Sequence, residues 1–149
     1  MAQLLILGYG NPLRSDDSVG WKLAEQLWQT ISSARVEVLA LHQLTPELAE
    51  PLSRAEAVFF VDASCDGEPG ELTSKPVLPK SGPVQFSHEL SPEAILGLAW
   101  QLYGACPQAF AFTLSGEWFD HGERLSPKVA LSLTHLTSLI RQIANHITH

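Results

Sequence analysis

The stretch LLILGYGNPLRSDDSVGWKLAEQLWQTI, residues 4–31, decides the fold, because it predicts a strand, a turn and a helix in immediate succession. Residues 4–9 form an apolar run that is too short for a helix and typical of a buried strand. After the turn, an apolar side chain recurs every four residues, at Val19, Leu23, Leu27 and Ile31. This spacing predicts an amphipathic helix over residues 19–31.

The alternation of strand-like and helix-like segments continues along the chain. Apolar or alternating runs predict strands at 35–41, 57–63 and 109–115, with short extended pieces around 72–77. Helices are predicted to begin at Pro46, Pro92 and Pro127, because each of these prolines follows a serine or threonine. Strands that alternate with helices indicate crossover connections, a largely parallel sheet and helices on both of its faces. With no linker or repeat in the sequence, we expect one α/β sandwich domain over residues 1–149.

Composition excludes several classes of protein. A chain of 149 residues with 45% hydrophobic and 17% charged residues is neither intrinsically disordered nor a long coiled coil. The formal charge of −7, without a cluster of lysine or arginine, argues against a nucleic-acid partner. The apolar runs fall far short of the ~20 residues that a membrane-spanning helix needs, so we expect no membrane partner.

The cysteines and the first residues predict a cytoplasmic protein. Cys65 and Cys106 cannot form a disulfide framework, and no metal-finger spacing surrounds them. The first residues have no basic stretch before their apolar run, which favours a strand over a signal peptide. A reducing compartment is therefore the expectation, with Cys65 as a small buried hydrophobic side chain.

Two carboxylates and one imidazole are the candidates for chemistry. In sheets of the predicted kind, ligands bind beyond the carboxyl ends of the strands. Asp17 follows the first strand and Asp62 closes the third, so both are expected at that edge, where His88 can reach them from a loop. Such a triplet suits a divalent transition metal. The alternatives are that Asp17, like Asp16, caps the following helix, that Asp62 is a solvated strand end, and that His88 is a surface residue.

A nucleotide site is not supported by the glycine-rich turn. Gly8-Tyr9-Gly10 is similar to the start of a dinucleotide fingerprint, but Leu13 occupies the place of its third glycine. The second strand ends in Leu41 and His42, where a ribose-binding acid is expected. No nucleotide cofactor is therefore predicted.

The same turn resembles the N-terminal signature of the hydrogenase maturation endopeptidases. GYGNPLRSDDSVG matches the pattern G-x-G-N-x-L-x-x-D-[DE]-x-x-G at every fixed position, namely Gly8, Gly10, Asn11, Leu13, Asp16, Asp17 and Gly20. Three later segments, VDASCDGEPG, SHELSPEAIL and GEWFDHGERLSPKVALSL, resemble further parts of that family in the right order. The resemblance spans essentially the whole chain.

The resemblance implies a fold, an activity and a partner. The fold is a five-stranded sheet flanked by helices. The activity is endopeptidase removal of a C-terminal extension from the large-subunit precursor of a [NiFe]-hydrogenase, after nickel insertion. The nickel belongs to the substrate, and the family's metal-contacting positions fall on Asp17, Asp62 and His88.

The mechanism and one alternative function remain open at this level. Water can be activated by the metal or by a carboxylate, so the enzyme is either metal-dependent or aspartyl-type. Asp16 is a further candidate for the catalytic set. The alternative function is that of a non-catalytic metal chaperone or docking subunit, which would use the same triplet without cutting.

Overall fold

A single mixed sheet forms the centre of the computed structural model, which describes residues 3–31, 33–82 and 90–147. Its strand order is β2-β1-β3-β5-β4. The strands are β1 (Leu4–Tyr9), β2 (Val36–Leu41), β3 (Ala57–Ser64), β4 (Leu72–Pro76) and β5 (Gln108–Ser115). All neighbours pair in parallel except β4, which runs antiparallel to β5 at one edge. The mostly parallel five-stranded sheet is therefore confirmed.

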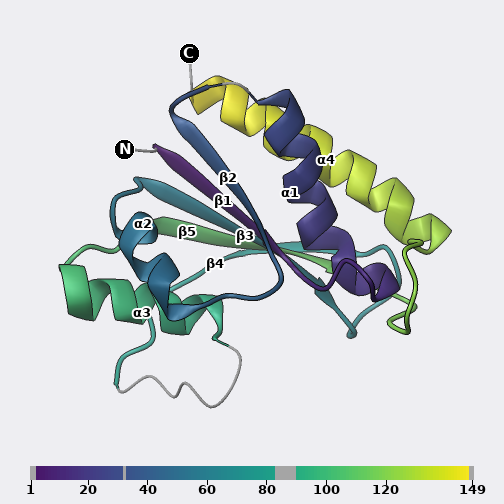
Figure 1. The fold of residues 1–149 in the computed structure, drawn as a ribbon, viewed down its shortest axis with the longest axis horizontal. Coiled ribbons are helices and arrows are strands. Elements are labelled where there is room, and N and C mark those ends of the chain that lie inside the picture. Colours follow the sequence, from purple (N-terminus) through teal and green to yellow (C-terminus); the bar gives the residue numbers. More distant parts are fainter. Residues whose placement is uncertain (1–2, 32, 83–89, 148–149) are drawn as a thin grey trace.

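Helices cover both faces of this sheet, as predicted. They are α1 (Val19–Thr30), α2 (Ala49–Ser53), α3 (Pro92–Tyr103) and α4 (Pro127–Ile147), with 3-10 turns η1 (Ser15–Ser18) and η2 (Pro46–Leu48). Helices α1 and α4 lie side by side on one face, whereas α2 and α3 lie on the other (Figure 1). The predicted three-layer sandwich is confirmed, and the prolines begin η2, α3 and α4.

The two faces of the sheet have separate cores. Along β1, Leu4 and Ile6 belong to the cluster under α1 and α4, whereas Leu5 and Leu7 belong to the cluster under α2 and α3. This division follows from the two-residue period of a strand, which directs neighbouring side chains to opposite faces. A strand that is buried on both faces has to be apolar throughout, which explains the unbroken run in residues 4–7.

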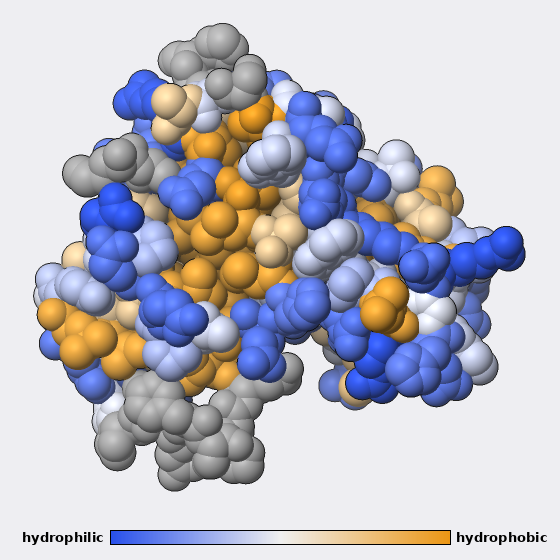
Figure 2. Space-filling view, in the orientation of Figure 1, coloured by the Kyte–Doolittle hydropathy of each residue, from blue (hydrophilic) through white to orange (hydrophobic). Residues whose placement is uncertain are grey.

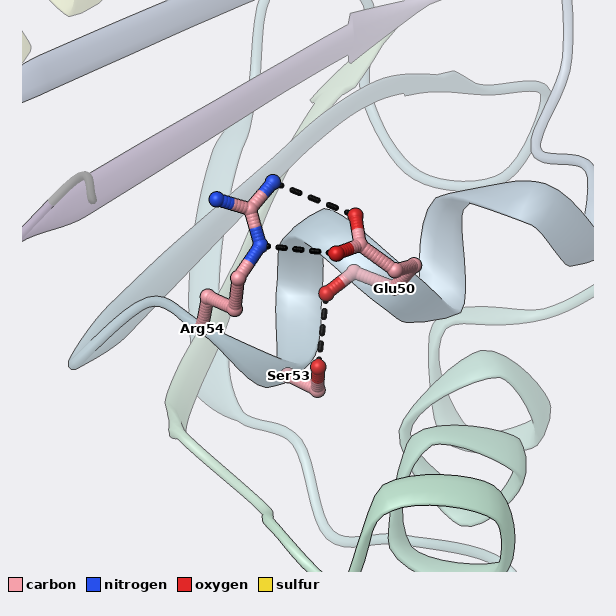
Figure 3. A network of polar contacts seen from close by, with 3 residues as sticks. All are labelled: Glu50, Ser53 and Arg54. Atoms are coloured by element: carbon pink, nitrogen blue, oxygen red, sulfur yellow. Dashed lines mark hydrogen bonds and ion pairs between the residues drawn. The ribbon is translucent and has the colours of Figure 1, made fainter.

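Helix α2 lies on the surface and ends in a small polar network. Arg54 pairs with Glu50 four residues earlier, with 2.9 Å between Nε and Oε1, and the Ser53 hydroxyl donates to the Glu50 carbonyl oxygen (Figure 3). Both charged side chains are about half exposed, so the pair adds little stability.

Some apolar surface remains around the edge strand β2. On the side of the molecule that faces the viewer, Figure 2 shows apolar residues gathered near the middle, where β2 runs in Figure 1. In β2 itself, Leu39 and Leu41 are only half-buried, although both pack against the core under α2 and α3. No helix in the described ranges is long and apolar enough to cross a membrane.

Helix α1 approaches the sheet so closely that glycine is required at the contact. A Cβ atom on Gly20 would overlap the backbone oxygens of Tyr9 and Val61, and a Cβ atom on Gly8 would overlap the backbone oxygen of Gly20. These are backbone atoms that cannot rotate away. The glycines at both ends of the signature therefore allow α1 to begin directly against β1 and β3.

We expect Gly20→Ala to lower the free energy of unfolding by about 3 kcal/mol, since the added methyl group forces two packed elements apart. Gly104→Ala is the matched control. Gly104 has a φ of 66° at the end of α3 with open space around it, so only backbone strain of about 1 kcal/mol is added. Urea unfolding followed by circular dichroism measures both, and equal losses would contradict the close-contact explanation.

Candidate functional site

A pocket of about 370 Å³ opens at the carboxyl edge of the parallel strands. Its walls come from residues at or just beyond the carboxyl ends of β1, β2 and β3, together with one residue from the segment before α4. The side chains that can bind a ligand or shape the pocket are Tyr9, Arg14, Asp17, His42, Asp62, Cys65 and Phe119. This is the edge at which ligands bind in parallel α/β sheets, and its volume suits a small group or a chain segment.

The structure brings Asp17 and Asp62 into this pocket, as their positions after two neighbouring strands predicted. Asp17 belongs to η1, where its Oδ2 accepts a hydrogen bond from the Asn11 amide at 2.9 Å. Asp62 lies near the end of β3, and its Oδ1 accepts from the Ala63 amide at 2.7 Å. Both residues are half-buried, so each carboxylate remains accessible to a ligand.

Neither Asp16 nor Asp17 caps the helix that follows, which corrects that alternative. Neither η1 nor α1 has a side-chain cap hydrogen bond. The chain instead turns sharply at Ser15, whose φ is 51°, so the two adjacent aspartates have different surroundings. Asp17 lines the pocket, whereas Asp16 is fully buried.

The Asp16 carboxylate binds the segment that leads into α4. Its Oδ2 accepts from the amides of Glu117 and Trp118, at 2.8 and 2.9 Å. Ser126 donates twice, from its amide to Oδ1 at 2.8 Å and from its hydroxyl to Oδ2 at 2.7 Å. Burial raises the pKa of Asp16, but these hydrogen bonds outweigh it and hold the pKa below its ordinary value of 3.8. Asp16 is thus a structural anion rather than a pocket group.

Backbone contacts join the same two segments, which we call the paired loops (residues 11–16 and 116–122). Ser15 donates its amide to the Gly122 oxygen at 2.8 Å, and Gly122 donates its own to the Leu13 oxygen at 2.9 Å. The Ser15 hydroxyl donates to the Asp120 oxygen at 2.8 Å. The paired loops are therefore joined although Ser15 and Asp120 are 105 positions apart in sequence, and each loop contributes one residue to the pocket, Arg14 and Phe119.

Sequence reasoning missed several residues of the pocket, among them Arg14, His42 and Cys65. His42 follows β2 and was considered only as the replacement of a ribose-binding acid, yet it lines the pocket. Its position beyond a parallel strand was the signal that could have identified it. Cys65 is exposed at the pocket, so the prediction of a buried hydrophobic role was wrong. The third predicted group, His88, lies outside the described residues.

The described pocket does not form a complete metal site by itself. Within residues 3–31, 33–82 and 90–147, no group of three His, Cys, Asp or Glu side chains is placed to hold a metal ion. Asp17 and Asp62 provide hard oxygen ligands that could complete the coordination of a metal held largely by another molecule. The same carboxylates could accept a proton from water.

Comparison with known proteins identifies the fold. No family model matches the sequence, and no curated protein matches it either. Among solved structures, the [NiFe] hydrogenase maturation protease HycI from Thermococcus kodakarensis KOD1 matches with 22% identity and a TM-score of 0.77, over 95% of this chain and 92% of that one. The hydrogenase maturating endopeptidase HybD from E. coli matches with 23% identity and a TM-score of 0.68, over 95% and 93%.

A second Thermococcus kodakarensis structure, the [NiFe] hydrogenase maturation protease HybD, matches with 23% identity and a TM-score of 0.72, over 97% of this chain and 99% of that one. Similarity at these identities establishes a shared fold over nearly the full length of each chain. The fold that the signature implied is thus confirmed.

We expect Asp16→Ala to lower the free energy of unfolding by about 3 kcal/mol, because it leaves three backbone amides and the Ser126 hydroxyl without their acceptor. This exceeds the ~1 kcal/mol that a helix cap contributes. The control is Asp66→Ala, at an exposed carboxylate, with an expected change within about 0.5 kcal/mol. Chemical denaturation measures the free energy of unfolding of both variants. A similar small decrease in each would contradict a stabilising role for the hydrogen bonds of Asp16.

The Asp16 contribution should also depend on pH in a defined direction. Its folded-state pKa lies below the ordinary value of 3.8, so the stabilisation is fully present above that value. It is lost as the pH falls through the lower, folded-state pKa. Asp16→Asn removes this titration, so the stability gap between wild type and variant should narrow in acid. A gap that is constant from neutral to strongly acidic pH would contradict this assignment.

Proposed function

We propose that this chain is an endopeptidase that removes the C-terminal extension of a [NiFe]-hydrogenase large-subunit precursor after nickel insertion. The observation that carries the proposal is the pairing of Asp17 and Asp62 in one pocket at the carboxyl edge of the sheet. Two further observations support it. Solved maturation proteases share the fold over most of both chains, and the signature of residues 8–20 matches at every fixed position.

Recognition of the precursor would depend on the nickel that the substrate already contains. Asp17 and Asp62 would complete the coordination of an ion that large-subunit cysteines hold, with His88 as the third contact that the resemblance implies. The described residues contain no set of three metal ligands, which fits this role, because a site with few ligands leaves coordination positions for the partner's own groups. A precursor without nickel would lose these contacts and bind poorly.

Hydrolysis requires a base, and this pocket provides it as a carboxylate. One water oxygen adds to the carbonyl carbon while Asp17 or Asp62 accepts a proton from that water. The C–N bond then breaks, and the same proton passes to the leaving amine. The new carboxylic acid releases its own proton to solvent. Nickel in the substrate would supply positive charge close to the reacting carbonyl group. We place the enzyme in the cytoplasm, where it would meet its precursor directly after synthesis.

We expect Asp62→Asn and Asp17→Asn each to lower the processing rate by a factor of about 100 or more, because each amide is a poor base and a weak metal ligand. Melting temperatures should change little, since both carboxylates are half-buried. The matched control is Glu56→Gln, at an exposed position just before the start of β3 and thus far from Asp62. The readout is the mass of the precursor after incubation with each variant.

His88→Ala should behave like the aspartate variants if the resemblance holds at that position. Near-normal processing by Asp62→Asn would refute the site. If the wild-type protein binds the nickel-loaded precursor and leaves its C-terminus intact, the chain is a docking subunit or metal chaperone instead.

We expect the cut to depend on nickel rather than on the sequence of the extension. Nickel-loaded precursor should be processed, whereas the same precursor without nickel, and the same extension fused to an unrelated protein, should remain intact. The physical reason is that a lost metal contact weakens binding more than a surface ion pair, which contributes ~0–1 kcal/mol. Mass spectrometry of the three substrates is the measurement. Efficient cleavage of the fusion would show recognition of peptide sequence and would remove nickel from the mechanism.

A further inference from the structure

Arg14 provides the permanent positive charge among the described residues that line the pocket. It lies in the same pocket as Asp17 and Asp62, and its side chain is exposed there. A guanidinium group stays protonated at any physiological pH and presents five N–H donors in a planar fork. The pocket therefore contains both a base and a strong donor of hydrogen bonds, which is the pair of functions that peptide hydrolysis requires.

The paired loops hold Arg14 in place. Its Nε donates to the Phe119 oxygen at 3.2 Å, which ties one edge of the guanidinium to the opposite loop. Its backbone is fixed as well, because the Arg14 amide donates to the Asn11 oxygen at 3.2 Å and the Arg14 oxygen accepts from the Asp17 amide at 3.0 Å. These contacts place the cation in advance and lower the ordering cost of using it.

The side-chain hydrogen bond of Arg14 goes to a backbone oxygen and not to a carboxylate. Within the part of the chain that the structure describes, Arg14 forms no ion pair with Asp17. Arg54 differs, because its Nε and Nη2 both bind the Glu50 carboxylate (Figure 3). In Arg14, Nε donates to the Phe119 oxygen, and the hydrogen bonds among the described residues do not use Nη1 or Nη2. A guanidinium with further N–H donors thus lines a pocket that can admit a substrate.

We propose that Arg14 binds the carbonyl oxygen of the scissile peptide bond and stabilises the negative charge that develops on it. The proposal rests on the endopeptidase function above and adds a catalytic residue to it. When water adds to the carbonyl carbon, the C=O electron pair moves onto the oxygen, which becomes an oxyanion. When the C–N bond breaks, that pair returns to re-form the carbonyl. Fixed donors directed at such an oxygen accelerate acyl transfer by binding the transition state more tightly than the substrate.

The test uses three variants of the full chain with nickel-loaded precursor. Arg14→Gln removes the charge, and Arg14→Lys keeps the charge but loses the fork. Arg35→Gln is the matched control. Arg35 is an exposed arginine just before β2, so it lies at the amino end of that strand, whereas the pocket lies at the carboxyl ends of the strands. Processing rates at several precursor concentrations give kcat and KM, and thermal melting monitors folding.

We expect Arg14→Gln to lower kcat by a factor of about 100 while KM changes less than about twofold, as for other lost oxyanion donors. Arg14→Lys should fall between this variant and the wild type, and Arg35→Gln should match the wild type. Wild-type kcat in Arg14→Gln would overturn the proposal. So would a loss that appears in KM and melting temperature instead of kcat, because that pattern indicates a structural role in the paired loops. Failure of the wild type to process the precursor would overturn the endopeptidase function itself.

Discussion

The buried Asp16 carboxylate is the interaction on which the architecture of the pocket depends. It accepts hydrogen bonds from three amides and one hydroxyl in the segment before α4, while its own backbone belongs to the turn before α1. A buried charge without these donors would be strongly unfavourable, so the two segments form together. Their pairing places Phe119 in the pocket wall and fixes the guanidinium of Arg14 beside it.

A second constraint acts through the backbone contact between α1 and the sheet. Gly20 allows the first turn of α1 to lie against Tyr9 and Val61, so η1 and its Asp17 are held at the end of β1. Because β1 and β3 are parallel neighbours, Asp62 emerges at the same edge. Tight packing between a strand and a helix thus sets the separation of two groups that are 45 positions apart in sequence.

The pocket combines groups with opposite roles in the proposed hydrolysis. Asp17 and Asp62 can accept a proton or contact a metal, whereas Arg14 can donate to an oxygen that gains charge. Asp17 and Arg14 use different partners, since Asp17 accepts from the Asn11 amide and Arg14 donates to the Phe119 oxygen. A substrate that contains its own nickel would then find in one place two carboxylates, each able to act as a ligand or as a base, and one hydrogen-bond donor. This combination is the basis of the proposed selectivity.

The sequence by itself determined the strands, the helices and the places of Asp17 and Asp62, because hydrophobic period and position after a strand are local properties. Only the tertiary structure showed that Asp16 binds residues 101 to 110 positions away, that Cys65 is exposed, and that His42 and Arg14 line the pocket. The reason is physical: a side chain's partners and burial depend on which distant segments pack against it. Two adjacent aspartates before a helix can either cap that helix or accept hydrogen bonds from a distant segment. Only the packed chain distinguishes these two roles.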